Sequence, residues 1–442
     1  MDDEGLIERH RKQFPSWMST FYERPLVPTR GSGNILTDAS GESYLDFYSA
    51  VSANILGYDV PEIWEAVREQ LRSGIVHLSP FYVSRRRVEL AERLAELSGI
   101  PDAVVSFTVS GSEAVDLALF LATLYRRSSH VLALRHGFHG TTFGAMAVTG
   151  DRRWVGMGLS PFQVGYARGG YDRHHGPSAG LDDAAYVRAC AQDLAELIGA
   201  GTADRVAALI VEPVQGVAGA APLAPGLLEA YRPILQREGI LLISDEVQTG
   251  WGRTGGHLWG YQHHDVVPDL LVFGKGLGGG FPIGGVVARR EIMEAMTGMR
   301  VSATSGDPLP VAAALATLDH VQAHDLPANA GRLGSLLLDG LRERIFDTAI
   351  VADVRGRGLL LAIEFTGPDR DSAGSEIAVR VQEGCRRNGV LVGLGGAEEH
   401  CLSLMPPLTL TEAQAREGME AIASAVREAD RGIAADRGGK AE

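Results

Sequence analysis

The sequence predicts an α/β protein: a large domain with a mostly parallel sheet covered by helices, and a smaller α+β domain. From about residue 61, helical and strand-like segments alternate along the chain. The strand-like segments are continuous apolar runs, the pattern of parallel strands that helices cover on both faces. The C-terminal part changes to long helices with few strands. We expect the large domain to span residues 61–309 and the small domain to combine residues 1–60 with residues 310–442.

The large domain begins with two segments of helical spacing, PEIWEAVREQL and RRVELAERLAELS. VVSFTVSG then predicts a strand that runs into the apolar helix SEAVDLALFLATLYRR, and HVLAL predicts the next strand. A βαβ unit follows, with strand VAALIVEP, helix PGLLEAYRPILQREG closed by Gly239, and strand ILLISDE. DLLVFGK and GGVVARR are the last strands expected in this domain.

The small domain is expected to join both ends of the chain. GSGNILTDASGESYLDF near the N-terminus predicts a hairpin, and DPLPVAAALATLDHVQAHDL and AGRLGSLLLDGLRERI predict long helices. VADVRGRGLLLAIEFT predicts a strand pair or one bent strand, followed by helix AVRVQEGCRRNGV and strand LSLMPPL. The last helix, TEAQAREGMEAIASAVREA, opens with a Thr-x-x-Gln capping pattern.

Composition limits which binding partners and which cellular location we expect for this protein. The 442 residues are 45% hydrophobic with a formal net charge of -14, which argues against nucleic acid or an anionic membrane. We see neither a secretory signal nor an apolar run of the ~20 residues that span a bilayer. The three cysteines, at 190, 385 and 401, lack metal or redox spacing. A cytoplasmic protein without a metal site is therefore expected.

One lysine stands out from its surroundings. The chain contains only Lys12, Lys275 and Lys440, and arginine supplies the rest of its 41 basic residues. Lys275 ends the apolar run DLLVF-G-K and precedes a glycine-rich turn. Arginine stays protonated, whereas a desolvated lysine can lose its proton and act as a nucleophile. The alternative interpretation is that Lys275 is an ordinary lysine at a strand end, with its ammonium group in solvent.

Other polar residues gather where predicted strands end, and ligands of open α/β sheets bind beyond those ends. Ser110, Gly111 and Ser112 lie between a strand and a helix start, which suits a phosphate. Phe138, with His139 beside it, follows the next strand and offers a face for a flat ligand.

Carboxylates end the two strands of the βαβ unit. Glu212 follows the first strand, Asp245 and Glu246 end the second, and Gln248 lies within one helical turn of Asp245. Buried acids are rare unless they are paired, so at least one of them should meet a cation.

A phosphate site, an aromatic face, a buried carboxylate, an amide and a lysine together match the needs of pyridoxal 5′-phosphate. This cofactor needs an anion site, a stacking partner and a carboxylate that keeps its pyridine nitrogen protonated. It also needs a lysine that binds its aldehyde and then moves protons. We therefore predict Lys275 as the Schiff-base lysine.

At this point the chain resembles the class III (omega) aminotransferases, which are fold type I pyridoxal-phosphate enzymes. The resemblance runs from about residue 20 to residue 428 and is carried by SGSEAVDLAL, HGFHGTTFGAMAVTG, VEPVQGVAG, LLISDEVQTGWGRTG, LLVFGKGLGGGFPIGG, DVRGRGLLLAIEF and MPPLTLTEAQ. The alanine–glyoxylate-aminotransferase-like and 2,2-dialkylglycine decarboxylase branches are the most similar.

The resemblance implies a role for each matching residue. Lys275 would be the internal aldimine and proton shuttle, Asp245 would pair with the pyridine nitrogen, and Gln248 would bond the ring hydroxyl. The resemblance also implies that Gly111 and Ser112 bind phosphate, Phe138 stacks on the ring and Glu212 lines the substrate side. It further implies a homodimer with active sites at the interface, in which a threonine contacts the neighbour's phosphate.

Three positions depart from the family pattern. Ser403 in LSLMPPL stands where the family commonly has an arginine that grips a substrate α-carboxylate. Val51 in DFYSAVSAN stands where the decarboxylases carry a glutamine, which argues against decarboxylation. Ala303 stands at the position of the interface threonine, so the adjacent Thr304 is the candidate for that contact.

These departures favour an aminotransferase acting on an amine without an α-carboxylate, such as an amino sugar or another specialised metabolite. Without its arginine partner, Glu212 could attract a substrate ammonium group, and Arg168 or Arg173 could still serve a carboxylate donor. The alternative is an epimerase or racemase acting at an amine-bearing carbon, which needs no amino-acid co-substrate.

Overall fold

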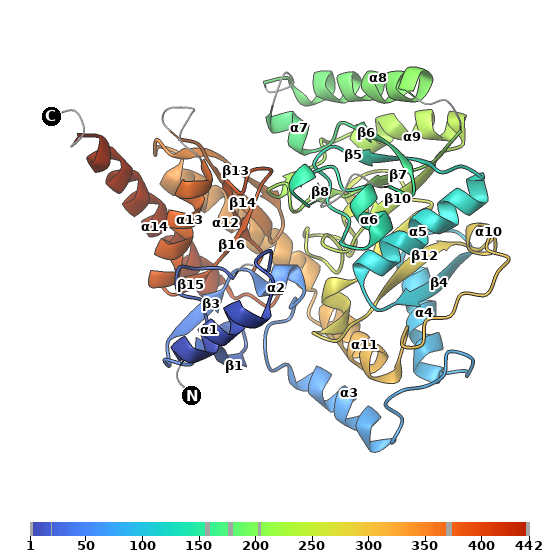
Figure 1. Ribbon diagram of the computed structural model, residues 1–442, viewed down its shortest axis with the longest axis horizontal. Helices are drawn as coiled ribbons and strands as arrows, with labels where there is room; N and C mark the ends of the chain where they lie inside the picture. The colour runs from blue at the N-terminus through green and yellow to red at the C-terminus, as the bar shows by residue number, and fades with distance from the viewer. Residues whose placement is uncertain are drawn as a thin grey trace.

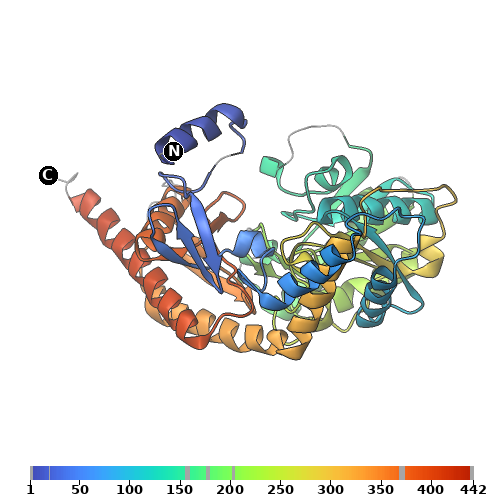
Figure 2. The ribbon, with the colours of Figure 1, turned by 90° about the horizontal axis from the view of Figure 1, so that it is seen from below.

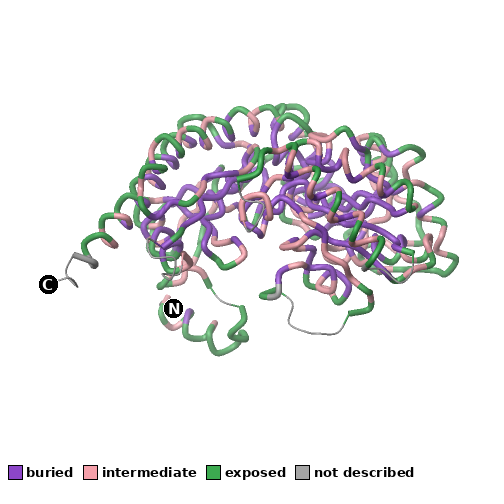
Figure 3. The backbone as a smooth tube through the Cα atoms, turned by 90° about the horizontal axis from the view of Figure 1, so that it is seen from above, coloured by how far each residue is buried: buried purple, intermediate pink, exposed green. Residues whose placement is uncertain are grey.

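The computed structural model describes residues 3–18, 20–154, 160–175, 180–201, 205–367 and 374–438. The middle of the chain forms one large body, and the N-terminal and C-terminal segments lie together in a second body beside it (Figure 1). Buried backbone is concentrated in the sheets of both bodies, and the outer helices alternate between buried and exposed residues (Figure 3). No helix within the described ranges is both long and apolar enough to cross a membrane.

The large body is organised around a seven-stranded sheet in the order β4-β12-β11-β10-β7-β5-β6. Only β12 runs antiparallel to its neighbours β11 and β4, so the predicted mostly parallel sheet is confirmed. The strands are β4 (Ala103–Thr108), β5 (His130–Leu134), β6 (Gln163–Ala167), β7 (Val206–Val211), β10 (Leu241–Asp245), β11 (Leu270–Phe273) and β12 (Gly284–Arg289).

Helices cover both faces of this sheet because successive apolar residues of each strand point to opposite faces. Helix α5 covers one face, with Val131, Ile210, Ile243 and Val272 of the strands in its core. The opposite face packs against α8 and α9 over one half and against α4 and α11 over the other. These helices are α4 (Arg85–Leu97), α5 (Gly111–Arg126), α8 (Asp183–Gly201), α9 (Leu227–Glu238) and α11 (Pro308–Ala323).

Shorter elements complete the large body. Gly239 ends α9 in the left-handed region with φ 66°, as its position after the helix predicts. Strand β6 and helix α8 were not predicted from the sequence. The remaining elements are α3 (Pro61–Arg72), α6 (Phe143–Ala147), α7 (Tyr171–His174), α10 (Arg290–Met293), β8 (Val214–Gln215), β9 (Ala221–Pro222) and the 3-10 turns Arg152–Trp154, Gly260–His263 and Lys275–Gly278.

The small body contains two four-stranded sheets, in the orders β1-β2-β3-β15 and β13-β14-β17-β16. Strand β15 pairs in parallel with β3, which ties the C-terminal part of the chain to its N-terminal part. The strands are β1 (Pro28–Ser32), β2 (Ile35–Asp38), β3 (Ser43–Asp46), β13 (Val351–Arg357), β14 (Leu360–Phe365), β15 (Val390–Leu391), β16 (Gly393–Gly395) and β17 (Cys401–Leu404).

The helices of the small body are α1 (Asp3–Gln13), α2 (Ser49–Ser52), α12 (Leu326–Ile345), α13 (Gly374–Arg387) and α14 (Glu412–Gly438). The predicted capping box of the last helix is present, since Thr411 Oγ1 accepts from the Gln414 amide at 3.3 Å and Gln414 Oε1 accepts from the Thr411 amide at 3.1 Å. VADVRGRGLLLAIEFT forms the antiparallel β13–β14 hairpin, so it is a strand pair and not one bent strand.

The predicted domain boundary at residues 309–310 falls inside α11. This helix contacts α3 and α4 of the large body. Helix α12 then leads from the end of α11 into the small body (Figure 2). We propose that the boundary between the domains lies at residues 324–325, between these two helices.

Candidate active site

The carboxyl ends of five strands meet around a cavity of about 150 Å³. Its wall contains Gly111 after β4, Phe138 and His139 after β5, Glu212 after β7, Asp245 and Gln248 at the end of β10, and Lys275 after β11. Ser112 also lines it. Residues from five separate stretches of sequence are therefore brought together, as expected for the edge of a parallel sheet.

Lys275 lies where this cavity meets a larger one, since it lines both of them. Its Nζ donates to Gln248 Oε1 at 3.1 Å. Burial lowers the pKa of Lys275 to about 8, although the Asp245 and Glu212 carboxylates act in the opposite direction. Lys275 also has φ 43°, a left-handed conformation that a non-glycine residue adopts at a cost. A substantial neutral fraction near pH 8 makes this amine a usable nucleophile.

Asp245 is held in one orientation from two sides. Its Oδ2 lies 2.7 Å from His139 Nδ1, and its Oδ1 accepts from the Val247 amide at 3.1 Å. Burial alone would lower the pKa of His139, but the hydrogen bond and the charge of Asp245 raise it. Among the described residues, His139 Nε2 is buried without a hydrogen-bond partner. His139 thus contacts Asp245 directly while lining the same cavity.

Glu212 lies on the wall of this smaller cavity. Its two oxygens accept from the backbone amides of Phe138 at 2.9 Å and Gly216 at 3.2 Å. Burial raises the pKa of Glu212 to about 7. Glu212 does not line the larger cavity described below. Its carboxylate therefore links the loop after β5 to the loop after β7.

Glycines leave room beside the start of α5. A Cβ on Gly111 would lie 2.7 Å from the Val247 side chain, and one on Gly140, at φ 128°, would lie 2.4 Å from Ser112 Oγ. Ser110 caps the helix by accepting from the Glu113 amide at 3.2 Å, so its side chain is not on the cavity wall. The first two residues of the 16-residue helix α5 line a cavity whose wall also contains the Lys275 amine and the Asp245 carboxylate. These residues fit pyridoxal 5′-phosphate.

A larger cavity of about 680 Å³ adjoins the first and shares Phe138, Gln248 and Lys275 with it. Ser403 of β17 and Val51 both line it, as expected for substrate-side residues. Val51 belongs to a turn, Ser49–Ser52, in which all four residues have positive φ. Asp46 Oδ1 accepts from the Ser49 amide at 2.8 Å, and this contact helps to hold the strained turn.

Arg153 is the one arginine among the described residues lining the larger cavity, and sequence reasoning missed it. Its Nη2 donates to Asp151 Oδ2 at 2.9 Å and to the Gly396 carbonyl at 2.6 Å. Arg168 and Arg173, the arginines named from the sequence, form ion pairs elsewhere and line neither cavity. Thr304 lies exposed in a turn before α11 and likewise lines neither cavity of its own chain.

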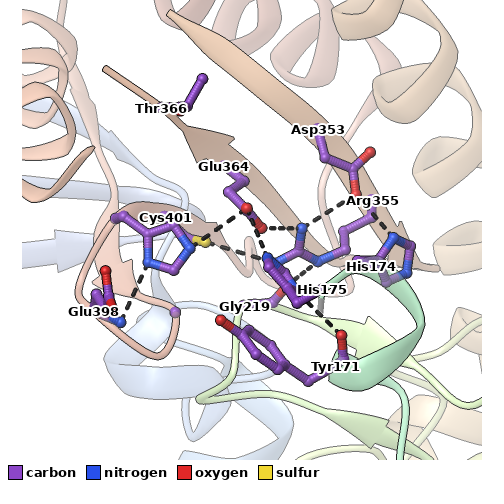
Figure 4. A network of polar contacts seen from close by, with 12 residues as sticks. Tyr171, His174, His175, Gly219, Asp353, Arg355, Glu364, Thr366, Glu398 and Cys401 are labelled. Atoms are coloured by element: carbon purple, nitrogen blue, oxygen red, sulfur yellow. Dashed lines mark hydrogen bonds and ion pairs between the residues drawn. The ribbon is translucent and has the colours of Figure 1, made fainter. Parts of the chain in front are cut away.

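An ion-pair network joins the two bodies (Figure 4). His175, just after α7, lies with its Nε2 2.8 Å from Glu364 Oε1, and Arg355 donates to the other oxygen of Glu364. His174 lies 3.2 Å from Asp353 Oδ2. Because His175 Nδ1 also faces the Tyr171 carbonyl at 3.1 Å, both of its ring nitrogens act as donors and the ring is protonated.

His175, Glu364 and His400 are close enough to suggest a metal site. The hydrogen bonds argue for ion pairing instead. His400 Nδ1 accepts from the Glu398 amide at 3.2 Å, so a neutral His400 carries its proton on Nε2, which lies 3.5 Å from Glu364. Each of the three side chains therefore has a hydrogen-bond or ion-pair partner among its neighbours.

The network predicts a pH-dependent effect of His175→Gln on stability. Burial would lower the pKa of His175, but Glu364 raises it. A raised pKa stabilises the fold fully below the unfolded value of about 6.5, and this stabilisation is lost as pH rises through the folded value. We expect the variant to lose about 1.5–3 kcal/mol of unfolding free energy at pH 6, and less at pH 9. Denaturant titrations at both pH values measure this, and an equal loss at both would contradict it.

The fold and the site define a pyridoxal-phosphate-dependent enzyme of fold type I. A model of the family "Aminotransferase class-III" matches residues 18–426. The chain belongs to this family and is a class III aminotransferase.

Similar proteins include an Arabidopsis thaliana mitochondrial alanine–glyoxylate aminotransferase 2 homolog, 34% identical over 94% of this chain and 86% of that protein. An alanine/serine racemase of Pyrococcus horikoshii is 31% identical over 96% and 90%. Among solved structures, a PLP-bound amine transaminase of an uncultivated Pseudomonas species has a TM-score of 0.88 and 31% identity, covering 95% of this chain and 99% of that one.

Proposed function

We propose that the enzyme transfers an amino group to or from an amine without an α-carboxylate, such as an amino sugar or another specialised metabolite. The observation that carries this proposal is Ser403, which lines the substrate cavity where the family commonly places a carboxylate-binding arginine. Arg153 does not replace it freely, because Asp151 and the Gly396 carbonyl already occupy its guanidinium. A serine hydroxyl cannot make the two parallel hydrogen bonds of a guanidinium to a carboxylate.

The proposed roles of the site residues follow their contacts. Bound pyridoxal 5′-phosphate supplies an aldehyde and an electron-withdrawing ring. Lys275, with its lowered pKa, binds that aldehyde and moves the proton at the reacting carbon. Asp245, which contacts His139, would pair with the ring nitrogen, and Gln248 would bond the ring hydroxyl.

Gly111 and Ser112 would hold the phosphate at the start of α5, and Phe138 would cover the ring, since all three line the smaller cavity. Phe138 is itself held by an edge-on contact with Trp154, whose ring centroid lies 5.1 Å away. We further propose a homodimer, in which the exposed Thr304 of one protomer reaches the phosphate position of its partner.

Racemisation remains the second candidate because the racemase of Pyrococcus horikoshii is similar over nearly the whole chain. Both reactions remove a proton from the carbon that bears the amine. Only transamination leaves the amino group on the cofactor, so the two differ in whether the enzyme needs a carbonyl acceptor.

Substrate preference tests the proposal against the family's common chemistry. We expect higher kcat/KM values for amino sugars or simple amines than for glutamate or alanine, with a stoichiometric carbonyl product. Turnover of glutamate, alanine and 2-oxoglutarate at far higher kcat/KM than any carboxylate-free amine would reject it.

Ser403→Arg should shift this preference. A guanidinium at position 403 would restore a charged hydrogen-bond donor in the cavity wall, worth about 1.5–3 kcal/mol for a carboxylate substrate. We expect kcat/KM for glutamate to rise by roughly 10- to 100-fold while that for carboxylate-free amines falls. Ser403→Gln, which adds a long polar side chain without a charge, is the control and should not increase kcat/KM for glutamate.

A further inference from the structure

Three carboxylates line the substrate cavity away from the strand edge that carries Lys275. Glu23 belongs to the N-terminal segment, Glu383 to α13 and Glu399 to the β16–β17 connection. None of them belongs to the motifs that hold the cofactor. Helix α13 and the β16–β17 connection belong to the small body, whereas Lys275 follows β11 of the large body (Figure 1).

Glu23 and Glu399 are exposed and Glu383 is half-buried, and no cation of the described protein pairs with these carboxylates. Among the described residues, the Glu23 and Glu399 carboxylates have no ion-pair or hydrogen-bond partner. Glu383 Oε1 accepts only the Glu23 amide, at 2.5 Å. Arg153 on the same wall is paired with Asp151. Arg386 stacks over the Tyr22 ring, 5.3 Å from its centroid, and donates to the Arg24 carbonyl.

The rest of the cavity wall is largely apolar. Tyr48, Trp154, Leu394 and Met405 line it together with Lys275. The volume of about 680 Å³ is in the range of sites for ligands much larger than alanine. One cavity thus combines a reactive amine, an apolar wall and several carboxylates without protein counter-ions.

We propose that the substrate carries a second ammonium group remote from the reacting nitrogen, and that Glu383 and Glu399 bind it. This inference rests on the proposed function and specifies its substrate class as a dication or polycation. An ammonium ion offers three donors to carboxylate oxygens, and an apolar wall around the intervening part of the substrate strengthens the attraction by excluding water. Flexible α,ω-diamines and rigid polyamino sugars share this chemistry.

Matched substrates test the proposal in the loaded holoenzyme. The flexible pair is 1-aminohexane and 1,6-diaminohexane, and the rigid pair is glucosamine and kanamycin. We expect kcat/KM to favour the polycation by about 10-fold or more in at least one pair, mainly through KM. The pair that shows the preference identifies the source of the second ammonium group.

Charge-neutralising variants locate the contact. Glu383→Gln and Glu399→Gln should each reduce the preference several-fold, and the double variant should abolish it while turnover of the monoamine is retained. Glu398→Gln is the control. Glu398 is adjacent to Glu399 in the sequence and exposed like it, but it does not line the cavity. It should leave the preference unchanged.

Two outcomes separate this inference from the proposed function. If carboxylate-free amines react but the polycation has no advantage, or keeps its advantage in the double variant, the carboxylate site is refuted and the proposed function stands. If only α-amino acids react, the proposed function fails and this inference fails with it.

Discussion

Lys275→Ala is expected to abolish turnover, with a loss of at least about 10³-fold in kcat. The variant removes both the amine that binds the cofactor aldehyde and the base that moves the proton at the reacting carbon. Purified Lys275→Ala protein should also lack the visible absorbance of the lysine-bound cofactor. Absorption spectra and steady-state rates of the variant measure both effects.

Two controls make this result specific to the position and chemistry of Lys275. Lys12→Ala removes a lysine in α1, which lines neither cavity, and should have unchanged activity and colour. Lys275→Arg keeps a positive charge but supplies no neutral amine, so it should be as inactive as alanine. Persistence of the lysine-type spectrum in Lys275→Ala would show that another residue binds the cofactor.

Asp245→Asn is expected to lower kcat by about 10²- to 10⁴-fold while the protein still folds. Asparagine retains the shape of the side chain but removes the negative charge that faces His139 at 2.7 Å and, in our proposal, the ring nitrogen of the cofactor. Without that charge the ring withdraws electrons less effectively at the step that breaks the bond to hydrogen. Single-turnover rates with a saturating amine measure the defect directly.

Asp269→Asn provides a matched control at the opposite edge of the same sheet. Asp269 is also buried, but it precedes β11 and pairs with Arg232 at 2.8 Å and Arg289 at 3.2 Å. Its replacement should lower the melting temperature without a comparable loss of kcat in the folded protein. Equal losses of kcat in the two variants would indicate that Asp245 acts only through stability.

The residues of the smaller cavity could be expected to lie together because one rule links local pattern to position. Each parallel strand delivers the residues at its carboxyl end to the same edge, so Gly111, Phe138, Asp245 and Lys275 could be placed together from strand order alone. Their hydrogen bonds still required coordinates. The contact between His139 and Asp245 joins residues of two different strands, and no local pattern specifies it.

The substrate side was predicted less well because it is assembled from distant parts of the chain. Strand β3 near the N-terminus pairs with β15 near the C-terminus. Glu23 precedes β3, and Glu383 and Glu399 lie on either side of β15, so all three reach one cavity. Arg153 enters the same cavity from a short 3-10 turn that has no distinctive sequence pattern. The family resemblance placed Glu212 on the substrate side, whereas in the structure its oxygens accept from two backbone amides.

The most direct test of the central claim is a single-turnover absorbance titration of the purified holoenzyme with single amines and no carbonyl acceptor. The panel contains glutamate, alanine, glucosamine, 1,6-diaminohexane and kanamycin. Our account predicts that a carboxylate-free amine converts the lysine-bound cofactor to its amine form and releases one equivalent of carbonyl product. Exchange of the substrate's hydrogen with solvent while the cofactor spectrum persists for every amine would contradict it and identify a racemase or epimerase.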